Sequence, residues 1–169
     1  MDAYCAEHEW SNRMAVIGPD LWSTHGYARC VGIWASRYAR FAIAAAFLSA
    51  VAGRFGLWAG TPGLSRFDAF IERTAALNFY APAAAIPVLA WAATVAETGL
   101  AVALLAGVWV RGAALGSSAL LATFGVLMAL ADGPKSPLDY SVFSASAAAL
   151  LLAERAARPA STSGTPNRS

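Results

Sequence analysis

Residues 112–131 read GAALGSSALLATFGVLMALA, a run of twenty residues without a charged side chain. The hydrocarbon core of a bilayer is about 30 Å thick, and an α-helix needs about 20 apolar residues to cross it. The run begins directly after Arg111 and ends at Asp132, so a charged residue stands at each of its ends. It therefore predicts one complete transmembrane helix.

A second apolar stretch, Pro87 to Val110, lies directly upstream and carries a single ionisable residue, Glu97. Together the two stretches exceed forty residues, which is too long for one crossing of a bilayer. We therefore expect two antiparallel helices, with Arg111 and Gly112 at the tight turn between them.

Two further crossings are expected on either side of this hairpin. The segment from Ala39 to Trp58 is apolar apart from Arg40 and Arg54 and predicts the first helix. At the other end, the uncharged stretch Tyr140 to Ala153 is short, and it spans a bilayer only if residues 137–139 form its first turn. The fold class predicted is therefore all-α, an integral membrane bundle of four transmembrane helices.

The composition agrees with a membrane environment. The chain has 169 residues, of which 58% are hydrophobic and 13% charged, roughly half the charged fraction of an ordinary soluble domain. So few charged groups cannot cover the surface of a soluble fold of this length, and the expected partner of most of the chain is the lipid bilayer. The formal net charge of +2 gives no reason to expect nucleic acid as a partner.

The four stretches form one predicted domain, residues 37–155, between two polar segments. Residues 1–36 predict a flexible extension without a signal peptide, within which Met14 offers an alternative start. Residues 156–169 are low in complexity and predict a disordered tail. Between the first two crossings, apolar residues recur at three- and four-residue spacing from Leu64 to Tyr80, which predicts a short amphipathic helix at the membrane surface or a plain linking helix.

The basic residues orient the predicted bundle. An even number of crossings puts both termini on one side, and cytoplasmic loops carry an excess of lysine and arginine. The side with the termini and the hairpin turn holds eight basic residues: Arg13, Arg29, Arg37, Arg40, Arg111, Arg155, Arg158 and Arg168. The other side holds four: Arg54, Arg66, Arg73 and Lys135. We therefore expect both termini in the cytoplasm.

Two ionisable residues within the apolar stretches are the first candidates for function, because charges inside a bilayer are costly. Arg54 lies one turn from the outer end of its helix, and Glu97 lies roughly 15 Å inside its own at 1.5 Å per residue. A direct or water-bridged pair is one interpretation, in which the two charges hold the helices together, move protons or hold a polar ligand. In the other, Arg54 reaches the interface by itself.

A third candidate is Lys135, in a turn that two prolines and a glycine make rigid. With Arg54, Arg66 and Arg73 it would give the outer mouth a positive lining that attracts a small anion, although a lone loop lysine is ordinarily just solvated.

No metal site is predicted. The polar head contains four residues of the types that bind zinc, but their spacing is loose: Cys5, His8, His25 and Cys30. No nucleotide-binding loop, catalytic triad or haem-ligating histidine is evident, so the residues themselves indicate no cofactor.

Several segments resemble the DoxX-like membrane proteins. They are residues 40–58, RFAIAAAFLSAVAGRFGLW, then Ala96-Glu97 in the second apolar stretch, and residues 133–138, GPKSPL, after the third. The resemblance covers about residues 37–153 and includes the order of the motifs. Two features depart from the family pattern: the head is longer, and Gly53 stands beside Arg54 where an acidic residue is expected.

The resemblance implies a four-helix bundle in a bacterial cytoplasmic membrane. Some members of that family are subunits of a thiosulfate:quinone oxidoreductase, and others belong to redox-stress complexes. The resemblance further implies that Arg54, Glu97 and Lys135 are candidate functional residues. It implies quinone as a ligand and other membrane or redox subunits as partners.

Three functions from different classes remain open at this point. One is a membrane subunit of a redox or sulfur-metabolising, quinone-linked complex, which rests on the resemblance alone. Another is a small transporter or exporter of an anion or other solute, which the charges within the apolar stretches favour. The last is an assembly or scaffold subunit without chemistry of its own. Whether the protein is an enzyme is left open.

Overall fold

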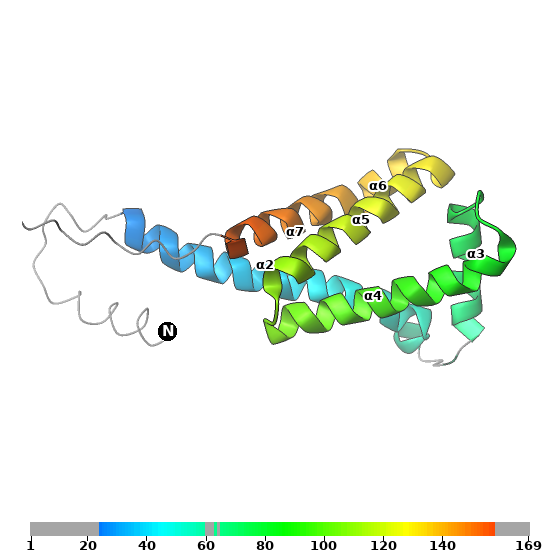
Figure 1. Ribbon diagram of the computed structural model, residues 1–169, viewed down its shortest axis with the longest axis horizontal. Helices are drawn as coiled ribbons and strands as arrows, with labels where there is room; N and C mark the ends of the chain where they lie inside the picture. The colour runs from blue at the N-terminus through cyan, green and yellow to red at the C-terminus, as the bar shows by residue number, and fades with distance from the viewer. Residues whose placement is uncertain (1–23, 60–62, 64, 158–169) are drawn as a thin grey trace, which may run out of the picture. The chain divides into compact units, whose positions relative to one another are not determined.

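The computed structural model of the protein describes residues 24–59, 63 and 65–157. Within these residues every element is helical, and no strand is present. The chain divides into two compact units after Tyr38, and each unit is described by itself. The all-α class predicted from the sequence is thus correct for the described part of the chain (Figure 1).

The first helix, α2, runs from Thr24 to Arg54, whereas the sequence predicted Ala39 to Trp58. It starts earlier because residues 24–38 contain no proline, and their polar side chains are compatible with a helix even though they are not apolar enough to mark one. Residues 24–36 were assigned to the flexible extension and are instead helical. Residues 1–23 lie outside the described residues, so the rest of that extension stays a prediction.

The helix also ends earlier than predicted. Gly56 has a φ of 74°, in the left-handed region, and its N–H donates to the carbonyl of Gly53. A left-handed glycine is a common way of ending a helix because it has no Cβ to clash. The chain then forms a short 3-10 turn, η3, from Leu57 to Ala59, so Trp58 lies outside the helix.

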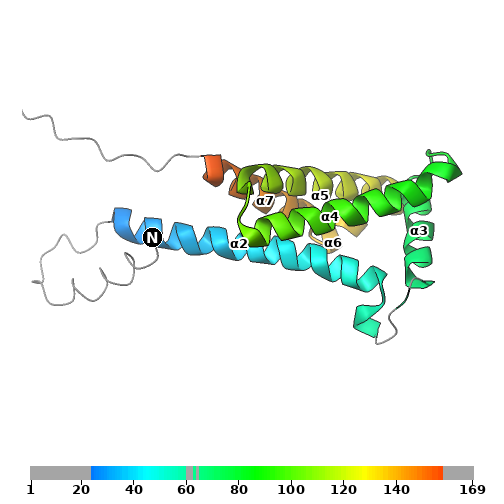
Figure 2. The same ribbon diagram turned by 60° about the horizontal axis from the view of Figure 1, so that its bottom comes forward.

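The predicted helix between the first two apolar stretches is present as α3, Ser65–Leu77. It is two-sided: Phe67 and Thr74 are buried, whereas Asp68 and Glu72 are exposed. Figure 2 shows α3 crossing near the start of α4, and it contacts both α4 and α5.

The predicted hairpin is present as α4, Ile86–Ala106, and α5, Val110–Asp132. A 3-10 turn, η4, from Ala83 to Ala85 precedes α4. The turn between the helices comes earlier than predicted. Gly107 adopts a φ of 71° and caps α4, which therefore ends at Ala106 and not at Val110. Residues 83–106 and 110–132 are long and apolar enough to cross a membrane by length and composition, and they are the two helices in the described part of the chain that meet this description.

The prediction for the last helix is wrong in one respect. Residues 137–139 are not its first turn but part of a separate short helix, α6, Lys135–Asp139. The final helix, α7, runs from Val142 to Ala157. The break comes at Ser141, whose φ of 54° no α-helix can contain. At 16 residues α7 is roughly 24 Å long, so four complete crossings stay a prediction.

The core of the second unit is built from small residues of α2, α4, α5 and α7. Six of the ten buried residues in the core cluster are alanine, and the other four are larger; the cluster comprises Ile43, Ala44, Phe47, Ala101, Leu104, Ala113, Ala114, Ala149, Leu152 and Ala153. α5 and α7 lie side by side (Figure 1), and the Ser146 hydroxyl donates to the carbonyl of Ser118 at 2.9 Å. Small residues let helix backbones approach closely, so α5 and α7 pack tightly together.

Candidate functional site

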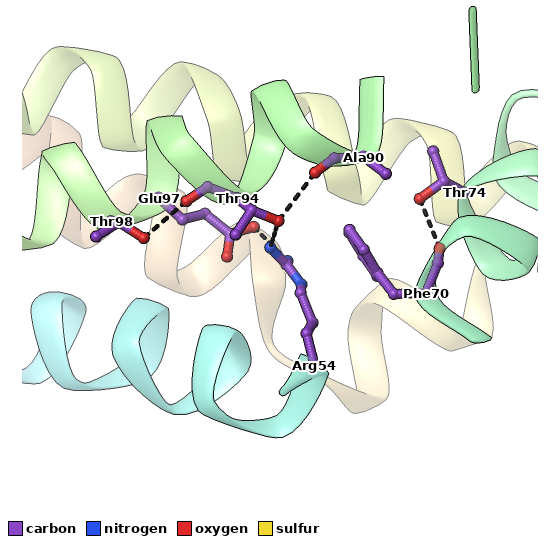
Figure 3. Close-up of polar contacts among 7 residues, drawn as sticks. All are labelled: Arg54, Phe70, Thr74, Ala90, Thr94, Glu97 and Thr98. Carbon is purple, nitrogen blue, oxygen red and sulfur yellow. Dashed lines mark hydrogen bonds and ion pairs between the residues drawn. The ribbon is translucent and has the colours of Figure 1, made fainter. Parts of the chain in front are cut away.

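Arg54 and Glu97 form a buried ion pair (Figure 3). Nη2 of Arg54 lies 2.6 Å from Oε1 of Glu97, and the two side chains are 10% and 1% exposed. The structure thus brings together two of the three residues singled out from the sequence, from segments 43 residues apart in the chain.

The helix geometry explains this meeting. Glu97 belongs to the buried face of α4, whose members recur at three- and four-residue spacing: Ile86, Ala90, Thr94, Glu97, Ala101 and Leu104. Arg54 is the last residue of α2. A side chain at a helix end is free of the next turn, so the guanidinium can extend toward α4.

Thr94 is a third member of the site, which the sequence analysis did not single out. Its hydroxyl accepts a hydrogen bond from Nη1 of Arg54 at 3.0 Å and donates one to the carbonyl of Ala90 at 2.9 Å. The guanidinium therefore has two anchors on α4, one charged and one neutral. A signal was present, because Thr94 precedes Glu97 by three residues and so shares its helix face.

Phe70 of α3 is a fourth member. The guanidinium carbon of Arg54 lies 3.8 Å from the centre of the Phe70 ring, within the range of a cation–π interaction. This contact could not be predicted from the sequence, since nothing local links residues on separate helices.

Other aromatic rings hold α3 over this end of α4. Phe67 of α3 lies 4.4 Å from Trp91 and 5.6 Å from Phe55, measured between ring centres. Such pairs favour offset and tilted arrangements like these. The aromatic rings and Phe70 together make α3 the cover of the Arg54–Glu97 pair.

One oxygen of the pair is unsatisfied. Among the residues that the structure describes, Oε2 of Glu97 is buried and has no hydrogen-bond partner. Buried polar atoms in proteins are nearly always hydrogen-bonded, so each exception asks for an explanation such as bound water, an ion or a chemical role.

Lys135 lies elsewhere, on the exposed helix α6. Its side chain is 84% exposed and pairs with Asp139 one turn along the same helix. An exposed pair of this kind is a common surface feature. The structure therefore places Lys135 outside the buried site.

Arg73 joins α3 to the end of α5. Its guanidinium makes two hydrogen bonds to the carboxylate of Asp132, and this contact raises the pKa of Arg73 above its ordinary value. The positive outer lining predicted from the sequence is correspondingly reduced, since Arg54, Arg73 and Lys135 each pair with a carboxylate.

Arg40 has a structural position that the sequence analysis missed. Its Nε and Nη2 donate to the carbonyl of Leu104 at 2.9 and 2.7 Å, in the last turn of α4. The C-terminal carbonyls of a helix have no partner within it and carry partial negative charge, so an arginine there satisfies a carbonyl and favours the helix dipole.

A surface groove lies apart from these residues. It is a groove of about 640 Å³ between α4 and α5, lined by small and apolar side chains that include Gly99, Gly116 and Trp109. None of the three predicted site residues lines it.

No group of three metal-binding side chains occurs in the described residues. Cys5 and His8, two of the four cysteine and histidine residues of the polar head, lie outside the described residues.

Comparison of the chain with protein-family models, with curated proteins and with solved structures finds no match. The resemblance to the DoxX-like proteins accordingly stays a prediction from the sequence.

Proposed function

We propose that this protein is a DoxX-like integral membrane protein, a four-helix bundle of the bacterial cytoplasmic membrane with both termini in the cytoplasm. In this proposal it is the membrane subunit of a redox or sulfur-metabolising, quinone-linked complex. The membrane part of the proposal rests on the distribution of large and small side chains, and the redox part on the sequence resemblance.

Large apolar side chains are distributed differently in this protein from those in a soluble protein, where they are mostly buried. Most buried residues are alanine, serine or threonine, whereas many large apolar side chains are exposed along the helices. On α4 the exposed residues Val88, Val95 and Val102 recur every seven positions and so line one face. Soluble monomers rarely expose continuous apolar surface of this kind. Lipid tails would cover it without free-energy loss, and small residues would serve the helix contacts.

The buried ion pair fits the same setting. Charged side chains in membrane helices characteristically face the interior and pair with one another, and Arg54 and Glu97 do both. Their contact also ties α2 to α4, which gives the pair a structural role whether or not it has a chemical one.

The test begins with membrane extraction of the full chain. Expressed in bacteria, the protein should stay with the membrane after washing at alkaline pH and be released only by detergent. Release by the alkaline wash would contradict the membrane assignment.

The redox role is tested after mild detergent solubilisation. The protein should co-purify with a partner subunit, and the complex should reduce a water-soluble quinone when thiosulfate is the electron donor. A preparation with intact helices and no partner, or a complex without quinone reduction, would contradict it.

A second function, transport of a small polar solute, is favoured by one observation: the buried oxygen of Glu97 that lacks a partner. A carboxylate kept partly unsatisfied inside a bundle is suited to accept a hydrogen bond from a passing group. An anion is the less suitable cargo, because three of the four cations counted at the outer mouth are paired with carboxylates. In a thermal-shift screen of the purified protein, stabilisation by an uncharged or cationic polar solute would support this function, whereas stabilisation only by thiosulfate or sulfate would indicate an anion instead.

A further inference from the structure

The carboxylate of Glu97 is satisfied on one side only. Oε1 accepts the hydrogen bond from Arg54 at 2.6 Å, while Oε2 is buried without a partner among the described residues. Removing a polar atom from water without a replacement hydrogen bond is unfavourable, and more so for a charged group. A stable fold that keeps such an atom is expected to supply a hydrogen-bond donor or to remove the charge by protonation.

The hydrogen-bond donors around Glu97 bind atoms other than Oε2. The Thr94 hydroxyl donates to the carbonyl of Ala90, and the Thr98 hydroxyl donates to the carbonyl of Thr94 at 2.8 Å. Nη1 of Arg54 is bound to Thr94. Neither threonine hydroxyl can turn to Oε2 without breaking the hydrogen bond that it donates now, and the guanidinium of Arg54 meets the carboxylate at Oε1 and not at Oε2 (Figure 3).

The burial of Glu97 limits what can bind Oε2. The groove between α4 and α5 has room for a ligand, but Glu97 is not among its lining residues. Glu97 instead lies 1% exposed between α2 and α4. A proton bonds covalently to a carboxylate oxygen, requires no cavity, and removes the negative charge whose burial is costly.

The surroundings can also support a neutral Glu97, because Arg54 would not be left alone. Protonation at Oε2 leaves Oε1 as an acceptor for Nη2, and Nη1 keeps its hydrogen bond to Thr94. The Phe70 ring, 3.8 Å away, attracts the guanidinium whether or not the carboxylate is charged. The cation therefore retains three favourable contacts when its counter-charge is removed.

The charged residues of α3, α5 and α7 are exposed, and Arg40 of α2 donates to the carbonyl of Leu104. On α3, Phe70 is the residue drawn beside Arg54 (Figure 3), and Arg73 is bound to Asp132 at the exposed end. The charged residues of α5 and α7 in the described part of the chain are exposed: Arg111, Asp132, Glu154 and Arg155. Arg54 is thus the charge that interacts with Glu97.

We propose that Glu97 is an exchangeable proton-binding site within the bundle. A proton from water at the α3 end binds Oε2, while Oε1 remains hydrogen-bonded to Arg54, and the same proton returns to water when the site empties. No electron is transferred and no other bond is made or broken. This inference rests on the proposed membrane bundle and names the chemistry of its polar centre.

The test uses dicyclohexylcarbodiimide, an apolar reagent that modifies protonated carboxyl groups. The full chain in phospholipid vesicles is treated over a series of pH values, and peptide mass spectrometry locates the modification. We expect Glu97 to be modified at acidic pH and progressively less as the pH rises. Peptide mapping makes the assignment to Glu97 independent of any variant.

Phe70→Leu tests whether the aromatic ring stabilises Arg54 when Glu97 is protonated. Leucine keeps apolar volume but removes the cation–π interaction. Arg54 depends more on that interaction when Glu97 is neutral. The midpoint of Glu97 modification should therefore move to lower pH by roughly half a unit. Phe79→Leu is the matched control, because Phe79 is an exposed ring outside α3, and its midpoint should equal that of the unmodified protein. An unchanged midpoint in Phe70→Leu would overturn the role of the ring.

Infrared spectroscopy decides the case in which Glu97 is not modified. A protonated-carboxyl band that titrates with pH and shifts on carbon-13 labelling of glutamate, but is missing from Glu97→Gln, would support the site. Absence of both the modification and the band, in protein that resists alkaline extraction, would overturn the proton site and leave the membrane assignment intact. Protein that the alkaline wash releases would instead contradict the membrane bundle on which the site depends.

Discussion

At the scale of single residues, the Arg54–Glu97 pair is the feature with the largest expected effect on stability. Glu97→Gln leaves the guanidinium without its counter-charge at alkaline pH, where the unmodified pair is charged. Removing one partner of a buried pair costs about 3–5 kcal/mol in soluble proteins, and less in membranes because the unfolded chain also finds partners there. The Phe70 ring should reduce the loss further, and acidic pH should reduce it again, because glutamine resembles the protonated carboxyl.

A double-mutant cycle measures the coupling directly. The unfolding midpoints of Arg54→Leu, Glu97→Leu and the double variant are compared in detergent or lipid. The double variant should recover part of the summed loss, because it leaves no uncompensated charge. Simple additivity of the two single changes would mean that the side chains do not interact in the folded protein.

Gly107 provides a second prediction at this scale. Its φ of 71° lies in the left-handed region, and an added Cβ would come 2.5 Å from Nη2 of Arg40. Gly107→Ala should therefore destabilise the protein by about 1–2 kcal/mol from backbone strain alone and displace Arg40 from the carbonyl of Leu104. The measurement is the thermal unfolding midpoint of the purified protein.

Gly99→Ala is the control for this change, since the same substitution on α4 meets nothing within 4 Å. Alanine favours a helix over glycine, so its midpoint should be unchanged or slightly higher. Equal destabilisation by the two changes would contradict the special role of the Gly107 turn.

At the scale of elements, α3 is the helix whose position can be altered most selectively. The aromatic contacts of Phe67 and the Arg73–Asp132 ion pair hold it against α4 and α5. Arg73→Gln should leave the unfolding midpoint nearly unchanged, because the pair is at the surface, where such pairs add little stability. It should increase amide hydrogen exchange within α3, because local opening depends on local contacts.

Arg66→Gln is the matched control on the same helix, since Arg66 is exposed. Mass spectrometry of α3 peptides should show faster exchange in the Arg73 variant than in the Arg66 variant. The same rate in both would mean that the ion pair with Asp132 does not hold α3 in place.

At the scale of the whole molecule, the prediction concerns topology. Reporter fusions after Lys135, and within residues 66–73, should be external, and fusions after Arg155 should be cytoplasmic, if the chain crosses the membrane four times. The short helix α7 makes the fusion after Lys135 the decisive one. A cytoplasmic signal there would mean that α7 does not carry the chain back across, and the four-crossing bundle would be wrong.

The sequence alone predicted the elements that depend on local patterns. The uncharged run at residues 112–131 identified α5 to within two residues at either end, because length and apolarity are properties of the run itself. The hairpin with α4 and the amphipathic helix α3 followed in the same way. The limits of α2 were missed, since a helix continues through polar residues that carry no apolar signal, and α7 was placed with one turn that belongs to α6.

The site was predicted only in part, for a different physical reason. Glu97 and Arg54 could be named because each is a charge in an apolar stretch, which the sequence displays directly. Their contact, the anchoring of Arg54 by Thr94 and the cover supplied by Phe70 depend on how each helix is rotated about its axis and how closely its neighbours approach. Those quantities are set by the packing of small residues across helix interfaces, so the tertiary structure alone decided that one oxygen of Glu97 is paired and the other is not.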